Sequence, residues 1–256
     1  MINLKNTIEK TKISIGSLGV FWLGQAGFAF KTSEGKVIYI DPYLSDAAER
    51  LHGFKRIMTS PIAAEDVVAD LVISTHEHVD HFDIDAIPKI AENQCTFFAG
   101  PIECVRAGQS MGISNDRIFS LDEETELDFD SFRVFGVPAF HGELAPDAVG
   151  VVLDFDGIKV YHAGDTAYYP EQMQRAIKLK PDILIPPING KFGNLNADEA
   201  ARLAHDAGAK IVIPSHFWMF IEHNGDPGAF VEACQKYAPE VQPLVMSQGE
   251  RYIYVK

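Results

Sequence analysis

Hydrophobic residues occur in short runs along this chain, and glycine or small polar residues separate most of them. Short runs bounded in this way are typical of β-strands. The first three predicted strands are residues 20–23, 28–30 and 37–40. Glycine-containing turns are predicted between them, at residues 24–27 and 33–35.

The middle of the chain continues this pattern. Strands are predicted at residues 71–73, 96–98, 126–129, 132–137, 150–155 and 158–161. Residues 71–73 are apolar throughout, as expected for a strand buried on both faces. Asp156-Gly157, between the last two strands, is a strong signal for a β-hairpin. One helix is expected here, over residues 84–93, with Pro88 in its first turn.

The last third of the chain alternates helices with strands. Helices are predicted at residues 170–179, 197–207 and 226–237, and strands at 183–185, 211–213, 244–246 and 252–255. Asn196 and Glu199 resemble a capping box for the second of these helices, and Gly208 is a natural stop. We therefore predict an α/β fold, a four-layer αββα sandwich that forms a single domain over residues 1–256.

Composition supports a globular protein and narrows its partners. The 256 residues are 46% hydrophobic and 23% charged, and the formal net charge is −14. An acidic surface repels phosphate backbones and anionic lipids, so we expect binding neither to nucleic acid nor to a membrane. No run of about 18 apolar residues is present that could span a bilayer.

The compartment is predicted from the cysteines and from residues 1–12. Cys95, Cys104 and Cys234 show no CxxC spacing, and an odd number of cysteines does not suggest a disulfide framework. Residues 1–12 are polar and lack the apolar core of a signal peptide. A cytoplasmic location is expected, with buried thiols in a reducing environment.

Residues 74–81 gather metal-ligating side chains directly after the predicted strand 71–73. His76 and His78 are alternate residues at a strand end, so their side chains point the same way and can hold one ion. Asp80 and His81 follow where the chain turns, and they can face a second ion. Catalytic groups of open α/β sheets gather at strand ends, which favours a metal centre here over a chance cluster.

Three further residues each follow a predicted strand: His141 after residues 132–137, Asp165 after 158–161, and His216 after 211–213. Each alone could equally be a capping or core residue. Taken with the cluster at residues 76–81, they complete a site for two metal ions.

The remaining histidines are less informative. His52 is expected in a polar loop, and His205 is expected to be exposed on a helix. His162 could orient Asp165 from behind without binding metal. His223 could line the mouth of a pocket.

The string His76-Glu77-His78-Val79-Asp80-His81 resembles the HxHxDH signature of the metallo-β-lactamase superfamily. His141, Asp165 and His216 match the remaining ligands of that superfamily in order and approximate spacing. Asp41, within residues 38–43, matches its first motif, whose aspartate supports the metal-binding loop. The resemblance extends from about residue 20 to the last strand.

The resemblance implies a division of the ligands between two ions. His76, His78 and His141 would hold one ion, Asp80, His81 and His216 the other, and Asp165 would bridge them. Imidazoles and carboxylates without cysteine suit zinc, manganese or iron, so two divalent ions, zinc or manganese with iron also suitable, are the expected cofactors. A water shared by the ions would become acidic enough to attack a carbonyl or phosphoryl centre. Asp80 is the candidate catalytic residue, as a proton shuttle.

Within the superfamily, the chain most resembles the L-ascorbate-6-phosphate lactonases and related metal-dependent hydrolases. The similar strings are residues 21–27, 161–165 and 209–216. The lactonases are longer, with extra sequence around residues 44–58. We predict from this resemblance a metal-dependent hydrolase that acts on a small ester or lactone.

Candidate substrate-binding residues are Lys191 and Asn189 in a glycine-rich loop after residues 183–185, together with His223. Such a loop can offer backbone N–H groups to a phosphate. The competing interpretation of Lys191 is a solvated surface lysine. The expected partner is therefore a small molecule that could be phosphorylated, and a homo-oligomer is left open.

Three alternatives compete with this prediction. A phosphodiesterase or nuclease of the same fold would use the same metals, but the net charge of −14 argues against a polyanionic substrate. A glyoxalase-type thioesterase would usually show a TPGHTxG-like string, whereas residues 137–142 read VPAFHG. A non-catalytic metal-binding module would be expected to have lost some ligands, and the set here is complete.

Overall fold

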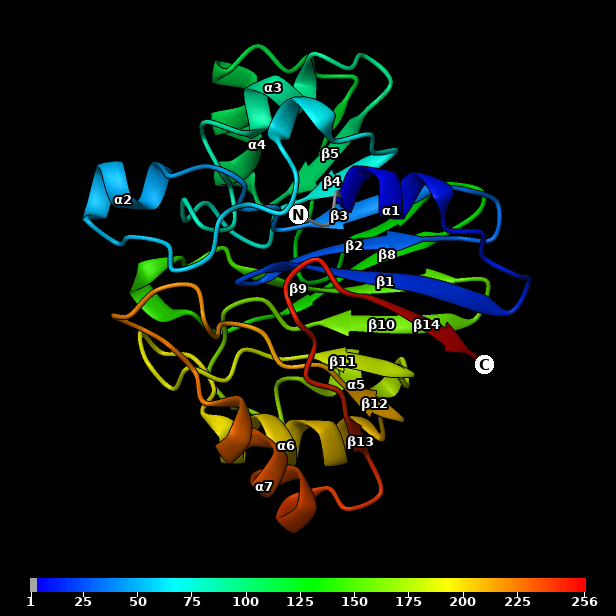
Figure 1. Cartoon of the computed structure of the whole chain (residues 1–256), viewed down its shortest axis with the longest axis vertical. Helices are drawn as coiled ribbons and strands as arrows, with labels where there is room; N and C mark the ends of the chain where they lie inside the picture. The colour runs from blue at the N-terminus through cyan, green and yellow to red at the C-terminus, as the bar shows by residue number, and fades with distance from the viewer. Residues whose placement is uncertain (1–3) are drawn as a thin grey trace. The chain divides into compact units, whose positions relative to one another are not determined.

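The computed structural model describes residues 4–256, which divide into two compact units. The first unit comprises residues 4–120 together with Ser247–Lys256, and the second comprises Leu121–Met246. Each unit contains one seven-stranded sheet with helices beside it (Figure 1). The single domain expected over residues 1–256 stays a prediction.

The sheet of the first unit has the strand order β14-β1-β2-β3-β4-β5-β6. Its strands are β1 (Ser17–Gly24), β2 (Gly27–Lys31), β3 (Val37–Ile40), β4 (Leu71–Ile73), β5 (Phe97–Gly100), β6 (Ile118–Ser120) and β14 (Arg251–Val255). Pairing is antiparallel from β14 to β3 and parallel from β3 to β6. The helical segments are α1 (Leu4–Lys10), α2 (Ala47–His52), η1 (Ala64–Asp66), α3 (Ile87–Ala91) and α4 (Ile102–Ser110).

The predicted strands of this unit are confirmed, but the predicted helix at residues 84–93 is too long. Its true span is α3, Ile87–Ala91. Asp83 explains the late start, because its carboxylate accepts hydrogen bonds from the backbone N–H groups of Asp85 and Ala86 and holds them in a turn. Strand β4 is buried at all three positions, as expected for a central parallel strand.

The sheet of the second unit has the order β13-β12-β11-β10-β9-β8-β7. Its strands are β7 (Glu126–Asp128), β8 (Arg133–Pro138), β9 (Val149–Phe155), β10 (Ile158–His162), β11 (Ile183–Ile185), β12 (Ile211–Val212) and β13 (Gln242–Pro243). Pairing is antiparallel from β7 to β10 and parallel from β10 to β13. The helical segments are η2 (Gly142–Leu144), α5 (Gln174–Lys178), α6 (Ala197–Ala207) and α7 (Pro227–Tyr237).

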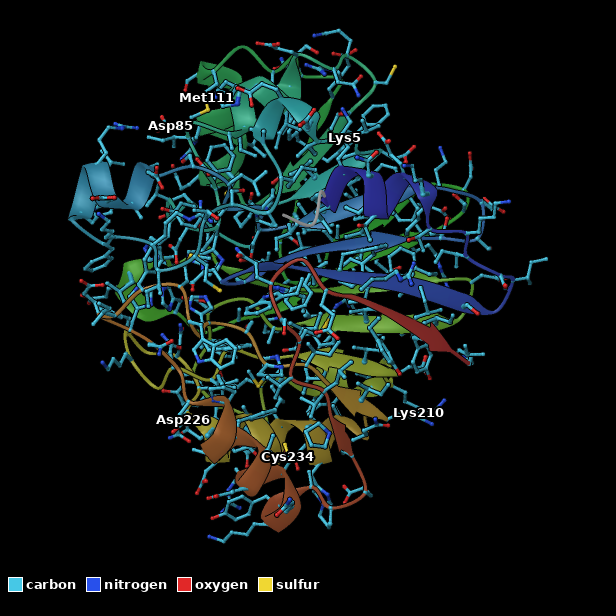
Figure 2. All side chains as sticks on the ribbon, viewed as in Figure 1. Lys5, Asp85, Met111, Lys210, Asp226 and Cys234 are labelled. Carbon is cyan, nitrogen blue, oxygen red and sulfur yellow. The ribbon has the colours of Figure 1, made fainter. Side chains whose placement is uncertain are left out.

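Local signals predict most of this unit correctly. Asp156 and Gly157 both have positive φ, as the tight hairpin between β9 and β10 requires. The capping box of Asn196 and Glu199 is present at the start of α6. Asp226, labelled in Figure 2, begins α7 by accepting hydrogen bonds from the backbone N–H groups of Gly228 and Ala229.

Two predictions in this unit are wrong. The helix expected at residues 170–179 is confined to α5, because the backbone N–H groups of Gln172 and Met173 both bond to the Tyr169 carbonyl and form a turn first. The strand expected at 244–246 lies earlier, as β13. Backbone hydrogen bonds from Gln242 to Lys210 and from Leu244 to Val212 fix the register of β13 against β12. The hydrophobic pattern at 244–246 does not predict these hydrogen bonds.

Across residues 4–256, no helix is both long enough and apolar enough to cross a membrane. The cytoplasmic location stays a prediction.

Candidate functional site

In the first unit, the candidate ligands follow β4 on a loop that is held by hydrogen bonds within the loop. The Ser74 hydroxyl donates to the His81 carbonyl (3.1 Å), and the His81 N–H donates to the His78 carbonyl (2.8 Å). The Ser74 N–H also bonds to Ala99 at the end of β5. These bonds bend residues 74–81 into a compact turn at the carboxyl end of the parallel strands, where α/β proteins place their chemistry.

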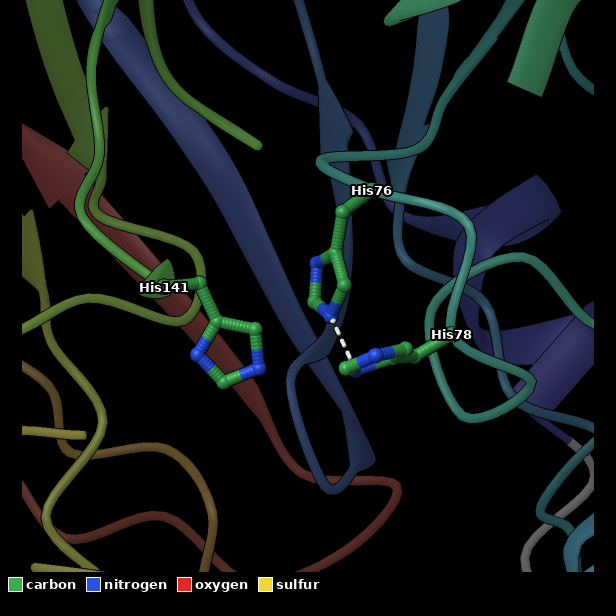
Figure 3. Close-up of side chains that lie close together, drawn as sticks. All are labelled: His76, His78 and His141. Carbon is green, nitrogen blue, oxygen red and sulfur yellow. Dashed lines mark hydrogen bonds between the residues drawn. The ribbon is translucent and has the colours of Figure 1, made fainter. Parts of the chain in front are cut away.

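The donor atoms on this turn converge. Nε2 of His76 lies 3.0 Å from Nδ1 of His78 (Figure 3). Two nitrogens bound tetrahedrally to one zinc ion would lie about 3.3 Å apart, so this spacing fits shared coordination. Nε2 of His81 lies 3.8 Å from Oδ2 of Asp80, which suits a second pair of ligands. The residues present in this unit therefore fit a metal ion by chemistry and by spacing.

Asp41 lies behind this turn and is fully buried. Its Oδ1 accepts a hydrogen bond from the Thr75 N–H, and its Oδ2 accepts from the Thr75 hydroxyl, each at 2.8 Å. Oδ2 also lies 2.8 Å from Nδ1 of His81. A carboxylate at this position holds the proton on Nδ1 and leaves the Nε2 lone pair for a metal. These contacts tie Asp41 to the loop of candidate ligands, and its supporting role stays a prediction.

Gln25 is a residue of this unit that the sequence analysis did not select. It lies in the β1–β2 turn with a φ of 52°, and it is 1% exposed. Its Nε2 donates to Oδ2 of Asp80 at 2.9 Å, and Trp22 Nε1 donates to the Gln25 carbonyl at 3.2 Å. Residues 21–27 carried part of the family resemblance, so a signal was present, but it did not single out Gln25.

Tyr43 is excluded as a base in this unit. Burial raises the pKa of its phenol to about 12, so the hydroxyl stays protonated near neutral pH. The hydroxyl also accepts a hydrogen bond from the Ala48 N–H.

In the second unit, Asp165 is the centre of the candidate ligand set. Its Oδ1 lies 2.7 Å from Nε2 of His216, and its Oδ2 lies 3.8 Å from Nε2 of His141. Both histidines and Asp165 are buried. Asn194, which the sequence analysis also missed, donates from Nδ2 to Oδ2 of Asp165 at 2.8 Å. The structure thus brings together all three candidate ligands predicted in this unit.

The turn that carries Asp165 is supported from behind. Nδ1 of the buried His162 accepts a hydrogen bond from the Gly164 N–H at 3.2 Å. Thr166 accepts from the Leu195 N–H through its carbonyl, and its hydroxyl accepts from the Phe140 N–H. His162 therefore acts on the backbone of the Asp165 turn, which is consistent with an orienting role.

The candidate substrate-binding residues lie on two neighbouring loops of the second unit. Lys191 is exposed, and its Nζ donates to the Glu222 carbonyl at 2.9 Å. His223 is buried, with its ring 6.1 Å from that of His216. Asn189 is 8% exposed, and its side-chain amide has no hydrogen-bond partner among the described residues.

The remaining candidate residues lie away from these groups. His205 is exposed on α6, as predicted, and pairs with Glu240. His52 is exposed but is the last residue of α2, so its expected place in a loop is wrong. Gly53, with a left-handed φ of 76°, ends that short helix. Cys104 and Cys234 are buried, whereas Cys95 is exposed.

Comparison with known proteins identifies the family of this chain. A family model described as a beta-lactamase superfamily domain matches residues 19–216. The chain belongs to this superfamily. A UPF0173 metal-dependent hydrolase of Rubrobacter xylanophilus is 30% identical, over 92% of this chain and 96% of its own. Another from Polynucleobacter asymbioticus is 30% identical, over 92% and 86%.

Solved structures agree with the fold of the superfamily. A metallo hydrolase from Ignicoccus hospitalis has a TM-score of 0.73 at 24% identity, covering 93% of this chain and 98% of the other. An isothiocyanate hydrolase from Delia radicum gut bacteria has a TM-score of 0.76 at 20% identity, covering 93% and 100%. The predicted α/β class of metallo-β-lactamase type is confirmed. The chain is a metal-dependent hydrolase of the metallo-β-lactamase superfamily.

Proposed function

We propose that this superfamily member hydrolyses the ester or lactone bond of a small molecule at a binuclear metal site. One ion would be held by His76, His78 and His141, and the other by Asp80, His81 and His216, with Asp165 bridging. The observation that carries the proposal is that each unit presents imidazole and carboxylate donors, and that each set is oriented by its own hydrogen bonds. Five of the donor residues are buried: His76, His81, His141, Asp165 and His216.

Zinc or manganese suits these ligands, and iron is also compatible with imidazoles and carboxylates. When bound, such ions would polarise the substrate carbonyl and lower the pKa of a water. The chain's own contribution begins with Asp41, which keeps Nε2 of His81 available as a ligand. Asn194 similarly holds Oδ2 of Asp165 and fixes the direction of that carboxylate.

Asp80 is proposed to move the proton between the attacking water and the leaving alkoxide. Its carboxylate is partly exposed, so it can reach both solvent and substrate. The amide of Gln25 fixes Oδ2 of Asp80 through a 2.9 Å hydrogen bond. We therefore assign Gln25 a positioning role for Asp80.

The proposed substrate class is supported by the resemblance to lactonases and by the net charge. A net charge of −14 disfavours a polyanion but allows a small molecule with one anionic group. Lys191, Asn189 and His223 are proposed to contact that substrate. To bind a phosphate, Nζ of Lys191 would exchange its hydrogen bond to the Glu222 carbonyl for one to the ligand.

A panel of substrates tests this proposal. Protein stripped of metal and reloaded with zinc or manganese is assayed on γ-lactones, carboxylic esters, thioesters, phosphodiesters and RNA, and on an isothiocyanate because one structural neighbour hydrolyses that class. Lactones or esters are expected to react fastest. Faster cleavage of RNA or of a phosphodiester would overturn the substrate class, and metal binding without turnover would favour a non-catalytic module.

The role of Lys191 needs a separate comparison. Lys191→Ala should raise KM for phosphorylated lactones more than for unphosphorylated lactones, whereas Lys178→Ala on α5 should affect neither. An equal loss on both kinds of lactone, or no loss on either, would remove the phosphate-binding role.

A further inference from the structure

Two loops of the second unit, residues 186–196 and 217–225, are joined at their base and at their tip. At the base, the Ile188 N–H donates to the Ser215 carbonyl (3.2 Å), while the Gly225 N–H donates to the His216 carbonyl (3.0 Å) and closes the second loop on itself. At the tip, Lys191 donates to Glu222. In Figure 1 these loops lead from β11 into α6 and from β12 into α7. We call this pair the loop clamp.

Three large apolar side chains of the loop clamp face solvent. Phe192 is 50% exposed, Trp218 is 43% exposed and Ile221 is 78% exposed. Single exposed apolar residues are ordinary, but these three lie on two joined loops and close in sequence to candidate site residues. We call these three residues the apolar rim.

The backbone under the apolar rim is strained. Phe192 and Trp218 each have a φ of 55°, and His216 has a φ of 59°. These are left-handed conformations in which a Cβ is disfavoured and which glycine usually occupies. Strain of this kind persists where a side chain is needed in one place, and it clusters at functional sites.

The loop clamp is built directly onto the candidate ligands of the second unit. A Cβ placed on Gly193, next to Phe192, would lie only 4.0 Å from Nδ1 of His141. The neighbouring Asn194 bonds to Asp165. The ring of His223 lies 5.3 Å from that of Phe192 and 6.1 Å from that of His216. Within this unit, Phe192 of the apolar rim therefore lies beside His223, and the loop that carries it contacts candidate ligands.

We propose that the apolar rim binds an alkyl or aryl substituent of the substrate, adjacent to the bond that is hydrolysed. This inference rests on the proposed function. Binding would remove water from the Phe192 and Trp218 rings, which is the usual source of affinity in small-molecule pockets. The buried amide of Asn189, which lacks a partner among residues 4–256, would donate to or accept from a polar group at the base of the substituent.

A chain-length series tests the apolar rim. With γ-lactones carrying alkyl tails of increasing length, kcat/KM of the wild-type protein should rise about two- to fourfold per added methylene. Phe192→Ala and Ile221→Ala should flatten this gradient. Ile221 is so exposed that its removal should leave folding intact, and thermal melts monitor Phe192→Ala. Phe97→Ala on β5, where Phe97 is 37% exposed, is the matched control and should keep the gradient.

Binding without turnover separates this inference from the proposed function. Calorimetric titration of the metal-loaded protein with carboxylates from acetate to octanoate should show the same length dependence, reduced in Ile221→Ala. If no lactone or ester is hydrolysed but affinity still rises with length, the proposed function fails and the inference stands. If lactones are hydrolysed at rates that ignore tail length, the inference is overturned. Self-association of the wild type that Ile221→Glu abolishes would also overturn it, because the apolar rim would then be a contact between protein copies.

Discussion

Replacement of Asp41 by asparagine offers the sharpest test of how the first unit prepares its metal ligands. In the wild type, Oδ2 of Asp41 lies 2.8 Å from Nδ1 of His81, and the carboxylate requires a proton on that nitrogen. An asparagine that keeps its oxygen on the Thr75 N–H turns its NH₂ group toward His81. Two donors then face each other, so His81 must move its proton to Nε2. In that tautomer Nε2 carries the proton and has no lone pair for a metal, and the Nδ1 lone pair faces the new amide.

The magnitude follows from the contacts that change. Loss of such an orienting hydrogen bond typically weakens metal binding by about 10- to 100-fold, or roughly 1.4–2.7 kcal/mol. Two hydrogen bonds of a fully buried carboxylate are also altered, those to the Thr75 hydroxyl and to His81. We expect the metal-free protein to lose about 2–4 kcal/mol of unfolding free energy. Competition with a chromogenic chelator gives the affinity, and urea denaturation gives the stability.

Asp83→Asn is the matched control. Asp83 is also fully buried and accepts five hydrogen bonds, none of them from a histidine. The donors are the Ser45 hydroxyl and the backbone N–H groups of Leu44, Ser45, Asp85 and Ala86. Its loss should reduce stability without a comparable loss of metal affinity. The reasoning is refuted if folded Asp41→Asn binds metal as tightly as the wild type. It is refuted equally if Asp83→Asn weakens metal binding as much as Asp41→Asn.

Three further predictions concern the metal count, Asp80 and a buried thiol. Elemental analysis of protein purified without chelator should approach two divalent ions per chain. Asp165→Ala should lower the occupancy of both metal sites, because a bridging carboxylate contacts both ions. If Asp165→Ala retains full metal content and full activity, Asp165 does not bridge the ions. Gln25→Ala should reduce kcat by about tenfold and shift the pH profile of kcat, because it releases Oδ2 of Asp80, while the metal content stays constant. An unchanged pH profile would argue against a positioning role of Gln25 for Asp80. Burial raises the pKa of the Cys234 thiol from 9.0 to about 11. The stability that the protein gains from keeping this thiol protonated is therefore complete below pH 9 and is lost as the pH rises to about 11. The loss in unfolding free energy is at most about 3 kcal/mol. Urea titrations across this range should show the decline in Cys95→Ala but not in Cys234→Ala, and an equal decline in both would exclude Cys234 as its source.

Much of the fold could be predicted because its signals are local. Strands β1 to β4 follow from apolar runs and turns, and α6 follows from its capping box and Gly208. The candidate ligands could also be selected, because the HxHxDH spacing and the position of each later residue after a strand are visible in the sequence. The error at 244–246 arises because backbone hydrogen bonds to another segment fix the register of β13, and the error at 170–179 arises because a turn on the Tyr169 carbonyl precedes α5.

The residues that orient the ligands could not be predicted in the same way. Gln25 is 55 positions from Asp80, and Asn194 is 29 positions from Asp165. An amide side chain in a turn carries no periodic or spacing signal. Its role exists only once the sheets bring two loops together, so it is visible in the structure and not in the residue pattern.

Backbone conformation is another property that the sequence conceals. Eight non-glycine residues among those described have positive φ. Three of them, Asp130, Asp156 and Lys180, lie in turns between regular elements, where such residues are tolerated. The other five are residues of the candidate site or of the apolar rim: Gln25, Asp41, Phe192, His216 and Trp218. The stability of the sheets that anchor the loops offsets the free-energy cost of these backbone conformations.

Phe192 allows this strain to be measured apart from the lost ring. Phe192→Ala and Phe192→Gly both remove the aromatic side chain, but only glycine relieves the φ of 55°. In regular structure glycine is less stable than alanine by about 0.5–1 kcal/mol, whereas a left-handed alanine costs roughly 1–2 kcal/mol. The glycine variant should therefore be the more stable of the two in urea by about 1 kcal/mol, while both lose the chain-length gradient equally. If alanine is the more stable variant, the backbone at Phe192 is not strained, and the argument that strain marks the apolar rim fails with it.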